Sequence, residues 1–600
     1  MNFYFIYFIY FIYFITFISN IFYKTNYMGE KNRRQFLETF TFKRSENDEQ
    51  YDINKDEIFL KYSNKVSPLE LKKTRAGLTQ YNGAWTEKQQ IHLLRRTLFG
   101  FTPNDLSTIS NMTMSQAVDL IINSTPATPA PPINYYESIY PDPTGVALGA
   151  TWVNAPYGDG TVNYYRYLST EAWWMKNILK QGLSIQEKMI VFWHNHFVCE
   201  DNVVGDSRLL YNYLNLLRTH ALGNFKTFVK EITKNPMMLF YLNGHYNIKN
   251  SPDENYAREV QELFTVGKGA NLWNEDDVKA VAKVLTGFRA DTVNITYNFD
   301  PNKHETGNKT FSSFYNNTVI TGQAGAAGEN ELDDLLNMIF AQSQTVAKFI
   351  CRKIYRFFVY YNIDANIEST IIAGLANTLI NNNWNIKPVL LQLFKSDHFY
   401  DSISMDCLIA NPMDYYLGMI KTLKIDINPA IGIVDETKAY YRIAFLCEEA
   451  AMSPGNPPSV AGWPAFYQEP QFHEMWINSD TLPKRMRYTD ALFTNSGIYV
   501  SGTYKLLCDV LVFASSLSNP SDPDILVNDC VKYLLAVGLT QTSKDYYKNI
   551  LTNNNANAYW TQAWNDYINN PGNVTYENIV KNRLRLMLTK LLQLAEHHLI

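Results

Sequence analysis

Apolar residues recur at helical spacing along most of this chain. From Trp85, the stretch WTEKQQIHLLRRTLFG carries Thr86 as a cap and Gln89 at the third helical position, the spacing of a capping box. Gly100 closes this helix, and Thr102 followed by proline opens the next one. Further helical segments with short connections are predicted at 163–290, 329–399 and 481–600. Within them, Ser184 and Glu187 repeat the spacing of a capping box, and Asn274 is the expected cap of a helix that ends at Gly287. The pattern predicts a mainly α protein whose many helices form a bundle-like body.

Three stretches interrupt the helical pattern. Residues 125–160 are rich in Pro, Ala, Gly and Tyr, and residues 453–480 read SPGNPPSVAGWPAFYQEPQFHEMWINSD, so both are expected to be long irregular loops. Between 291 and 325, alternation and β-branched residues indicate one small β-hairpin. The expected regions are an apolar repeat segment (1–27), a polar N-terminal arm (28–84), a helical core (85–490) and a C-terminal helical region packed on it (491–600).

Residues 3–23 form an apolar run, FYFIYFIYFIYFITFISNIFY, that is long enough to cross a bilayer. Its three-residue repeat fits neither a helix nor a strand, and Met28 offers an alternative start. The run is therefore either a membrane anchor, with the basic residues behind it favouring a cytoplasmic body, or translated sequence upstream of the true start. From Met28 the chain reads MGEKNRRQFL, the core of a twin-arginine export signal, but the apolar region that should follow is missing. Localisation stays open, and a membrane is an expected partner only if 3–23 is a real segment.

The composition and the motifs that are absent argue against several classes of function. Hydrophobic residues make up 46% of the chain and charged residues 18%, which is a globular balance. The net charge is −5 and no Lys/Arg-rich run appears, so nucleic acid is not an expected partner. The six cysteines form no C-x-x-C pair, which argues against a thiolate zinc site and a disulfide framework. The sequence also lacks H-E-x-x-H, G-x-S-x-G, phosphate-loop and dinucleotide motifs.

The stretch VFWHNHFVCE places His194 and His196 one residue apart between aromatic residues. Histidines can bind a divalent metal or act as acid and base. On a helix, however, residues two apart point about 200° away from each other. Joint chelation therefore needs a break in the helix, and no Gly or Pro supplies one. The competing interpretation is that one histidine is a hydrogen-bonded core residue while the other lines a cavity.

A second polar group lies in SPDENYAREVQELFTVGKG. With Asp253 as the helix cap, Asn255, Glu259 and Glu262 share one face beside the apolar side, and Arg258 stands four residues before Glu262. Such a stripe can supply a general base, a hard-metal ligand or buried partners for basic residues. The alternative is an ordinary solvated face.

Two loops carry further candidates. KHETGNKTF holds His304, Glu305 and Lys309 in a glycine-containing turn that could bind an anionic or carbonyl group. In the last long loop, Trp463 and Trp476 could form an aromatic platform for sugar rings or apolar ligands. Equally, these tryptophans could pin the loop onto the helical body.

Eight segments occur in a fixed order: HLLRRTLFGFTPNDL, EKMIVFWHNHFV, NPMMLFYLNG, ENYAREVQELFTVG, DDVKAVAKVLTGF, the His304–Lys309 loop, AKFICRKIYRFFV, and PPSVAGWP with WINSDTLPKR. Together they resemble the bacterial family called domain of unknown function 1800, and the form PPSVAGWPAFYQEP looks like members from the Bacteroidetes. The recurrent motif positions of the family map here onto His194, Asn195, His196, Asn255, Tyr256, Arg258, Glu259, Glu262, His304, Gly307, Lys309 and Trp463. This sequence departs from the family at Glu305, where Asp is more frequent.

The resemblance implies little chemistry, because no activity is established for the family. Its members are typically expected to be exported and often occur beside sulfatase-like proteins. Those associations point to cell-surface or polysaccharide work, although a shared fold does not determine function. The altered N-terminus of this chain is at odds with export.

Our leading hypothesis is an enzyme-like pocket assembled from the FWHNHF, ENYARE and HETGNK segments. His194 and His196 would bind a divalent metal or act as acid and base, with Glu259 as a further ligand and Glu259 or Glu262 as catalytic carboxylates. The expected substrate-binding residues are Arg258, Asn255, His304, Lys309, Trp463 and Trp476. The 453–480 loop would cover the site.

The expected reaction is metal-assisted hydrolysis of cell-surface or extracellular glycans, with a polysaccharide or a sulfatase-like protein as partner. The alternative is a non-catalytic surface, assembly or glycan-binding protein. In that case the same polar residues form a buried hydrogen-bond network that fixes how the helices pack.

Overall fold

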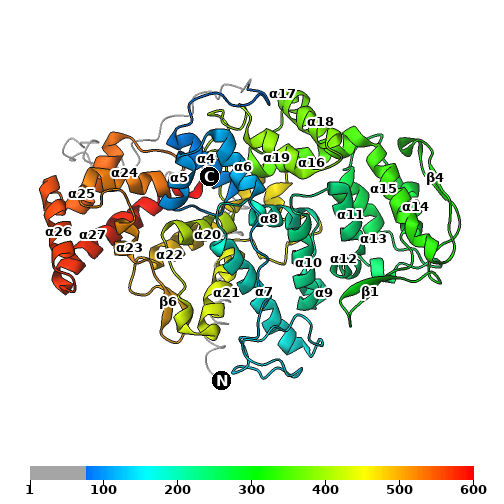
Figure 1. Cartoon of the computed structure of the whole chain (residues 1–600), viewed down its shortest axis with the longest axis horizontal. Coiled ribbons are helices and arrows are strands. Elements are labelled where there is room, and N and C mark those ends of the chain that lie inside the picture. Colours follow the sequence, from blue (N-terminus) through cyan, green and yellow to red (C-terminus); the bar gives the residue numbers. More distant parts are fainter. Residues whose placement is uncertain (1–75) are drawn as a thin grey trace, which may run out of the picture. The chain divides into compact units, whose positions relative to one another are not determined.

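The computed structural model describes residues 76–600. Helices dominate this part of the chain, and its residues belong to one unit (Figure 1). In the part of the chain that is described, the named strands form three two-stranded antiparallel sheets. The prediction of a mainly α protein with small β-hairpin structure is therefore confirmed. The predictions for the apolar run at 3–23 and for the start at Met28 lie outside the described residues.

The helices follow one another with few long interruptions. The first run comprises α4 (Glu87–Thr97), α5 (Pro103–Ser110), α6 (Met114–Asn123), α7 (Gly160–Lys180), α8 (Gln186–His196), α9 (Asp201–Val204), α10 (Ser207–His220), α11 (Phe225–Lys234) and α12 (Pro236–Tyr241). The second comprises α13 (Asn255–Glu259), the π-helix η3 (Val260–Thr265), α14 (Glu275–Val284), α15 (Glu331–Ala341), α16 (Ser343–Phe358), α17 (Ala365–Ile367), α18 (Ala373–Asn381) and α19 (Ile386–Phe394). The third comprises α20 (Pro412–Thr422), α21 (Ile433–Glu449), α22 (Thr481–Ala491), α23 (Val510–Ser515), α24 (Pro523–Leu534), α25 (Gln541–Thr552), α26 (Asn557–Asn569) and α27 (Val574–Leu592).

Capping residues set several helix starts as the sequence predicts. Thr86 and Gln89 form the capping box of α4, and Thr102 accepts a hydrogen bond from the backbone N–H of Asp105 at the start of α5. Asn274 caps α14 in the same way. In each case a side chain satisfies a backbone donor that the first helical turn leaves without a partner.

The capping box expected at the start of α8 is not formed, which corrects that prediction. The Ser184 hydroxyl accepts from the backbone N–H of Gln186 at 3.3 Å and donates to the carbonyl of Ser124 at 3.0 Å, whereas the backbone N–H of Glu187 donates to Gln181 and not to Ser184. The Glu187 carboxylate is 2.8 Å from Arg218 and accepts a hydrogen bond from Trp174. Because Glu187 is buried, an ion pair there outweighs a cap at the surface.

The helix α8 lies in the core. It is buried on all sides, although it carries polar residues as well as the apolar run from Met189 to Trp193. The indole of Trp193 donates to the carbonyl of Ala221 at 2.8 Å, and its ring stacks on Phe225 with centroids 5.8 Å apart. The neighbouring Lys188 forms a buried ion pair with Asp414 of α20. Every side chain that α8 carries is thus placed by packing or by a buried partner.

The loop before α7 has a small core of its own. Tyr135, Tyr136 and Trp152 are buried together, and their cluster extends to the start of α7. A buried ion pair of 3.0 Å joins Arg166 to Asp142 within the same region. The long irregular loop predicted at 125–160 is present, and its aromatic residues fold it against the helices.

The hairpins pair β1 (Phe288–Asp291) with β2 (Thr296–Phe299), β3 (Lys309–Thr310) with β4 (Val319–Ile320), and β5 (Ile498–Ser501) with β6 (Tyr504–Leu506). Only one strand pair was predicted, between 291 and 325. The first hairpin starts before that range, and the third lies in the C-terminal region. Their strands are two to four residues long, so alternation is too short to stand out.

The C-terminal residues pack on the rest of the unit. The guanidinium of Arg95 in α4 donates to the carbonyl of Leu535 at 2.5 Å. An isolated antiparallel bridge joins Ile409 to Leu599. Among the described residues, none of the helices is both long and apolar enough to span a bilayer.

Candidate functional site

The two histidines of α8 do not converge. The helix continues without a break to His196, so the two rings leave it in different directions. His194 contacts Trp174, Tyr213 and Trp463, whereas His196 contacts Phe264 and Lys353. The structure therefore separates the two rings instead of pairing them.

His194 is fully buried and makes one hydrogen bond. The hydroxyl of Tyr213 donates to the carbonyl of Phe197 at 2.6 Å, so its oxygen is left to accept from His194 Nδ1 at 3.2 Å. His194 Nε2 is then an unprotonated acceptor with no hydrogen-bond partner among the described residues. Burial lowers the pKa of His194 to about 3, so the ring is neutral at physiological pH.

His196 has both ring nitrogens occupied. Its Nε2 donates to the carbonyl of Phe264 at 3.1 Å, and its Nδ1 accepts from the Lys353 ammonium at 3.1 Å. Burial, together with the charge of Lys353, holds the pKa of His196 well below its usual range. Burial and the neighbouring Arg356 lower the pKa of Lys353 to about 7. The buried His196 and the half-buried Lys353 are therefore both held by hydrogen bonds within the chain.

His196 and Lys353 both contact η3 (Val260–Thr265), which directly continues α13. We call this segment the π-turn. The backbone N–H of Val266 donates to the carbonyl of Gln261, five residues back. A π-turn leaves nearby carbonyls without their usual helical partners. Lys353 Nζ donates to the carbonyl of Leu263 at 2.9 Å, and His196 donates to that of Phe264. The His196–Lys353 pair thus replaces hydrogen bonds that a regular helix would make.

Glu259 and Glu262 flank the start of the π-turn and are both half-buried. Burial and the charge of Glu262 raise the pKa of Glu259 to about 7, with Arg258 and Lys268 acting in the opposite direction. Within the described chain, the Glu259 carboxylate makes no hydrogen bond or ion pair. The Glu262 carboxylate lies 3.3 Å from Lys268. Glu259 is therefore a carboxyl group that can both give and take a proton near neutral pH.

A tyrosine and a third glutamate lie near Glu259. The Tyr241 hydroxyl donates to Glu200 at 2.6 Å. Burial, the bond to Glu200 and the charge of Glu259 all raise the pKa of Tyr241. Glu200 and Tyr241 were not predicted from the sequence, because Glu200 directly precedes α9, Tyr241 ends α12, and the two share no motif.

Arg258 does not form an ion pair with Glu262, although the spacing of four residues predicts one. Its guanidinium makes two hydrogen bonds of 2.7 and 2.6 Å to Glu275 of α14 and lies 3.6 Å from Glu254. The widened π-turn displaces Glu262 from the position it would hold on a regular helix. The predicted Asn255 is exposed, and its backbone N–H donates to Asp253. Arg258 is thus engaged with carboxylates of the chain itself.

The KHETGNK loop forms a separate buried ionic cluster. His304 Nε2 lies 3.1 Å from one oxygen of Glu331, and Lys309 Nζ lies 2.5 Å from the other. All three side chains are 0 or 1% exposed, and His304 Nδ1 also bonds to the carbonyl of Thr286 at 2.9 Å. Hydrogen bonds from His304 and Lys309 hold the pKa of Glu331 below its usual range despite its burial. These partners come from α15 and the loop itself, so His304 and Lys309 are not brought together with the α8 histidines.

The two predicted platform tryptophans are covered. Trp463 is 1% exposed and Trp476 is 3% exposed. The Trp463 ring meets His194 edge-to-face at 5.6 Å, and its backbone N–H donates to Asn195 at 2.9 Å. Trp476 packs at 5.7 Å against Phe466 of the same loop, and Phe466 stacks on Phe357 of α16 at 5.3 Å. Trp463 therefore holds the 453–480 loop on the helices directly and Trp476 does so through Phe466, which is the alternative weighed for them in the sequence.

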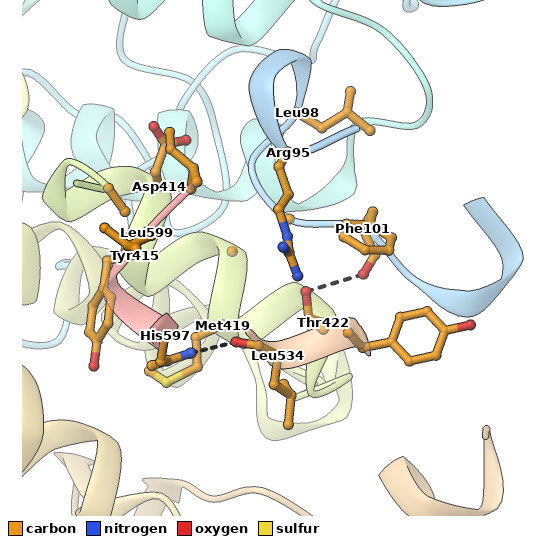
Figure 2. A pocket seen from close by; sticks show the side chains of 15 residues that line it. Arg95, Leu98, Phe101, Asp414, Tyr415, Met419, Thr422, Leu534, His597 and Leu599 are labelled. Atoms are coloured by element: carbon orange, nitrogen blue, oxygen red, sulfur yellow. Dashed lines mark hydrogen bonds between the residues drawn. The ribbon is translucent and has the colours of Figure 1, made fainter. Parts of the chain in front are cut away.

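A metal-ligand cluster and a ligand cavity are two other kinds of site that the structure can reveal. Among the described residues, no group of three or more His, Cys, Asp and Glu side chains is placed to hold a metal ion. Figure 2 shows a cavity of about 60 Å³ that includes none of the predicted site residues. There Arg95 donates to backbone carbonyls, and His597 Nδ1 donates to the carbonyl of Leu534 at 2.8 Å. This space lies where the C-terminal residues pack on α4 and α20.

The fold is that of a mainly α protein, and the polar residues His196, Lys353, Glu259 and Glu262 lie around its π-turn at Val260–Thr265. The model of the family described as "Protein of unknown function (DUF1800)" matches residues 92–594, so the chain belongs to that family. The match confirms the resemblance found in the eight segments and extends beyond 490 into the C-terminal helices. The comparisons with curated proteins and with solved structures gave no match.

The most informative residue that the sequence analysis missed is Lys353. It stands in AKFICRKIYRFFV, one of the segments that carry the family resemblance, but nothing in its spacing points to the π-turn. Its role follows only from the tertiary contact with His196 and the Leu263 carbonyl. Glu331 was missed for the same reason, because its partners lie more than twenty residues away in the chain.

Proposed function

We propose that this chain is a hydrolase of cell-surface or extracellular glycans that uses Glu259 as its acid–base group. The observation that carries the proposal is the half-buried Glu259 carboxyl, which has a pKa raised to about 7 and no hydrogen-bond partner in the described chain. A general acid–base group works best when its pKa is near the working pH. Most glycoside hydrolases use two carboxyl groups, one of them with a raised pKa. Glu262 supplies a second carboxylate beside Glu259.

The π-turn supports the same assignment. Such turns are rare and occur often at functional sites. Here the turn is held by buried partners on one side, and it presents Glu259 and Glu262 on the half-buried side. A rigid support under a reactive side chain fixes its position relative to a substrate.

A divalent metal remains part of this proposal only through oxygen ligands at the π-turn. Both nitrogens of His196 are hydrogen-bonded, and His194 contacts a different set of residues. Glu259 and Glu262 are hard ligands of the kind that Mg²⁺ and Mn²⁺ prefer. Activity that survives exhaustive chelation and is not raised by added Mn²⁺ would remove the metal from the mechanism.

The direct test is hydrolysis of bacterial surface polysaccharides, measured as new reducing ends. Glu259→Gln is expected to lose about 10²–10⁴-fold in kcat, the usual contribution of a general acid–base group. Asp276→Asn, which removes an 89% exposed carboxylate paired with Lys279 on the next helix, is the matched control and should keep the wild-type rate. A Glu259→Gln variant that cleaves at the wild-type rate would exclude the proposal.

A second candidate is the non-catalytic surface or assembly protein. It is favoured by the burial of His194, His196, His304, Lys309 and Trp463, which act here as packing partners. This candidate predicts binding of a polysaccharide or of a sulfatase-like protein without turnover. It gains support if Glu259→Gln leaves binding intact while no polysaccharide is cleaved by the wild type.

A further inference from the structure

A second group of acidic side chains lies beneath the start of the 453–480 loop. Glu171 of α7 and Asp201 of α9 are 7% and 5% exposed. Asp201 Oδ1 is buried and has no hydrogen-bond partner among the described residues. In the same part of the chain, no basic side chain forms an ion pair with either carboxylate.

The first turn of the loop brings these acids together. The Tyr167 hydroxyl lies 2.6 Å from Glu171 Oε1 and 3.1 Å from the carbonyl of Pro454, and it accepts from Asn456 at 2.8 Å. The backbone N–H of Asp201 donates to the carbonyl of Gly455 at 3.2 Å. Glu171, Tyr167 and Asp201 therefore meet at three consecutive loop residues, 454–456.

Five other buried acids of the described chain have a cation beside them, and the buried Asp277 is instead satisfied by hydrogen bonds from Ser312 and Asn274. Such pairs join Asp142 to Arg166, Glu187 to Arg218, Asp206 to Arg208, Asp414 to Lys188 and Glu331 to Lys309. Burial, reinforced by neighbouring acids, raises the pKa of Glu171 to about 8 and that of Asp201 to about 7. Two buried acids without a counter-charge need either a bound cation or bound protons.

We propose that Glu171 and Asp201, together with Tyr167 and the carbonyl oxygens of the 454–456 turn, form a site for a divalent cation of the Ca²⁺ type. The donor set consists of oxygens alone, which is the preference of this hard cation. Two carboxylates balance its charge, and neutral oxygens complete the coordination. The bound cation ties the 453–480 loop to α7 and α9. This site is separate from the π-turn and does not depend on the proposed hydrolase activity.

The test is a Ca²⁺ titration of the chelator-treated full chain, followed by calorimetry and by thermal unfolding. Ca²⁺ at about 100 times its Kd is expected to raise Tm by about 2–3 °C, because a ligand that binds only the folded state stabilises it. Tb³⁺, used as a spectroscopic substitute, should show luminescence sensitised by Tyr167 that Ca²⁺ displaces. Asp201→Asn and Glu171→Gln should each lose the Tm shift and the Tb³⁺ signal.

Asp414→Asn is the matched control. It also removes a buried carboxylate, but that carboxylate lies on α20, is paired with Lys188 and does not contribute to the proposed site. The control is expected to lower Tm and to keep the full Ca²⁺ response. The proposal is overturned if the wild type shows no Ca²⁺ binding, or if Asp201→Asn and Glu171→Gln respond like the wild type. A third outcome is that the wild type does not respond to Ca²⁺ and that both variants have a higher Tm than the wild type without Ca²⁺. That outcome would also overturn the proposal and would show that the two acids hold protons instead.

Discussion

Two polar regions meet at the π-turn and use their side chains in different ways. On one side, the buried His196 and the half-buried Lys353 bond to each other and to the carbonyls of Phe264 and Leu263. On the other side, the half-buried Glu259 has no such partner in the described chain and has a raised pKa. A buried polar group that is fully hydrogen-bonded contributes to structure. A partly exposed group without partners is free to exchange a proton with a substrate. This difference distinguishes the residues that support the π-turn from the candidate catalytic residue.

The largest expected effect is the loss of Glu331, which belongs to the scaffold. Glu331→Ala would leave Lys309 as a buried charge without its partner and would remove the acceptor of His304. Breaking a buried ion pair in this way costs about 3–5 kcal/mol of unfolding free energy. Urea denaturation of the variant and the wild type measures the loss. A loss below about 1 kcal/mol would mean that the cluster is not the buried support described here.

The next effect concerns the pair that holds the π-turn. His196→Ala is expected to cost about 2–4 kcal/mol, because it creates a cavity and leaves the Phe264 carbonyl and Lys353 without a buried partner. Lys353→Met keeps much of the side-chain volume and should cost less, about 1–3 kcal/mol. Both values come from denaturant unfolding. If either variant proved as stable as the wild type, the pair would not be what supports the turn.

The pH dependence of stability should have opposite signs for the buried His194 and the half-buried Glu259. His194 has a folded pKa of about 3 against an ordinary value of 6.5, so the unfolded state binds more protons below pH 6.5. Its contribution to stability is therefore lost as the pH falls from 6.5 towards 3. Glu259 has a folded pKa of about 7 against 4.5, so the folded state binds more protons between these values. Its contribution is lost as the pH rises from 4.5 to 7.

The smallest of these effects is expected for Glu259→Gln. The neutral amide removes the cost of ionising a half-buried carboxyl, so the variant should gain roughly 1 kcal/mol at pH 8 after allowance for solvent screening. It should gain almost nothing at pH 4.5, where the carboxyl is already protonated in the folded protein. A gain at pH 8 accompanied by lost activity is typical of a catalytic residue. A loss of stability at pH 8 would instead give Glu259 a structural role.

Local sequence rules predicted the helix starts that depend on one side chain and its own turn. Thr86 with Gln89, and Asn274, cap their helices as expected. The capping box at Ser184 failed because Glu187 has a buried partner, Arg218, that lies thirty-one residues away in the chain. The separation of His194 from His196 was predictable, since it follows from helical geometry alone.

The π-turn could not be predicted from the sequence. The stretch NYAREVQELFTV has the composition of an ordinary helix, and the turn is stabilised by contacts from distant segments. Lys353, His196 and Tyr315 reach it from α16, α8 and the β3–β4 hairpin region. The burial of Trp463 and Trp476 could not be predicted either, because the sequence identifies them as aromatic but does not show whether their rings are exposed or packed against other residues. Those parts of the site depend on tertiary packing.

The measurement that tests the central claim most directly is the pH dependence of unfolding free energy for the wild type and Glu259→Gln, between pH 4.5 and 8.5. The account predicts that the two curves meet near pH 4.5 and separate progressively up to about pH 7, with the variant more stable above that pH. This divergence would establish the raised pKa on which acid–base chemistry at the π-turn depends. Parallel curves over the whole range would contradict it and leave Glu259 as an ordinary surface carboxylate.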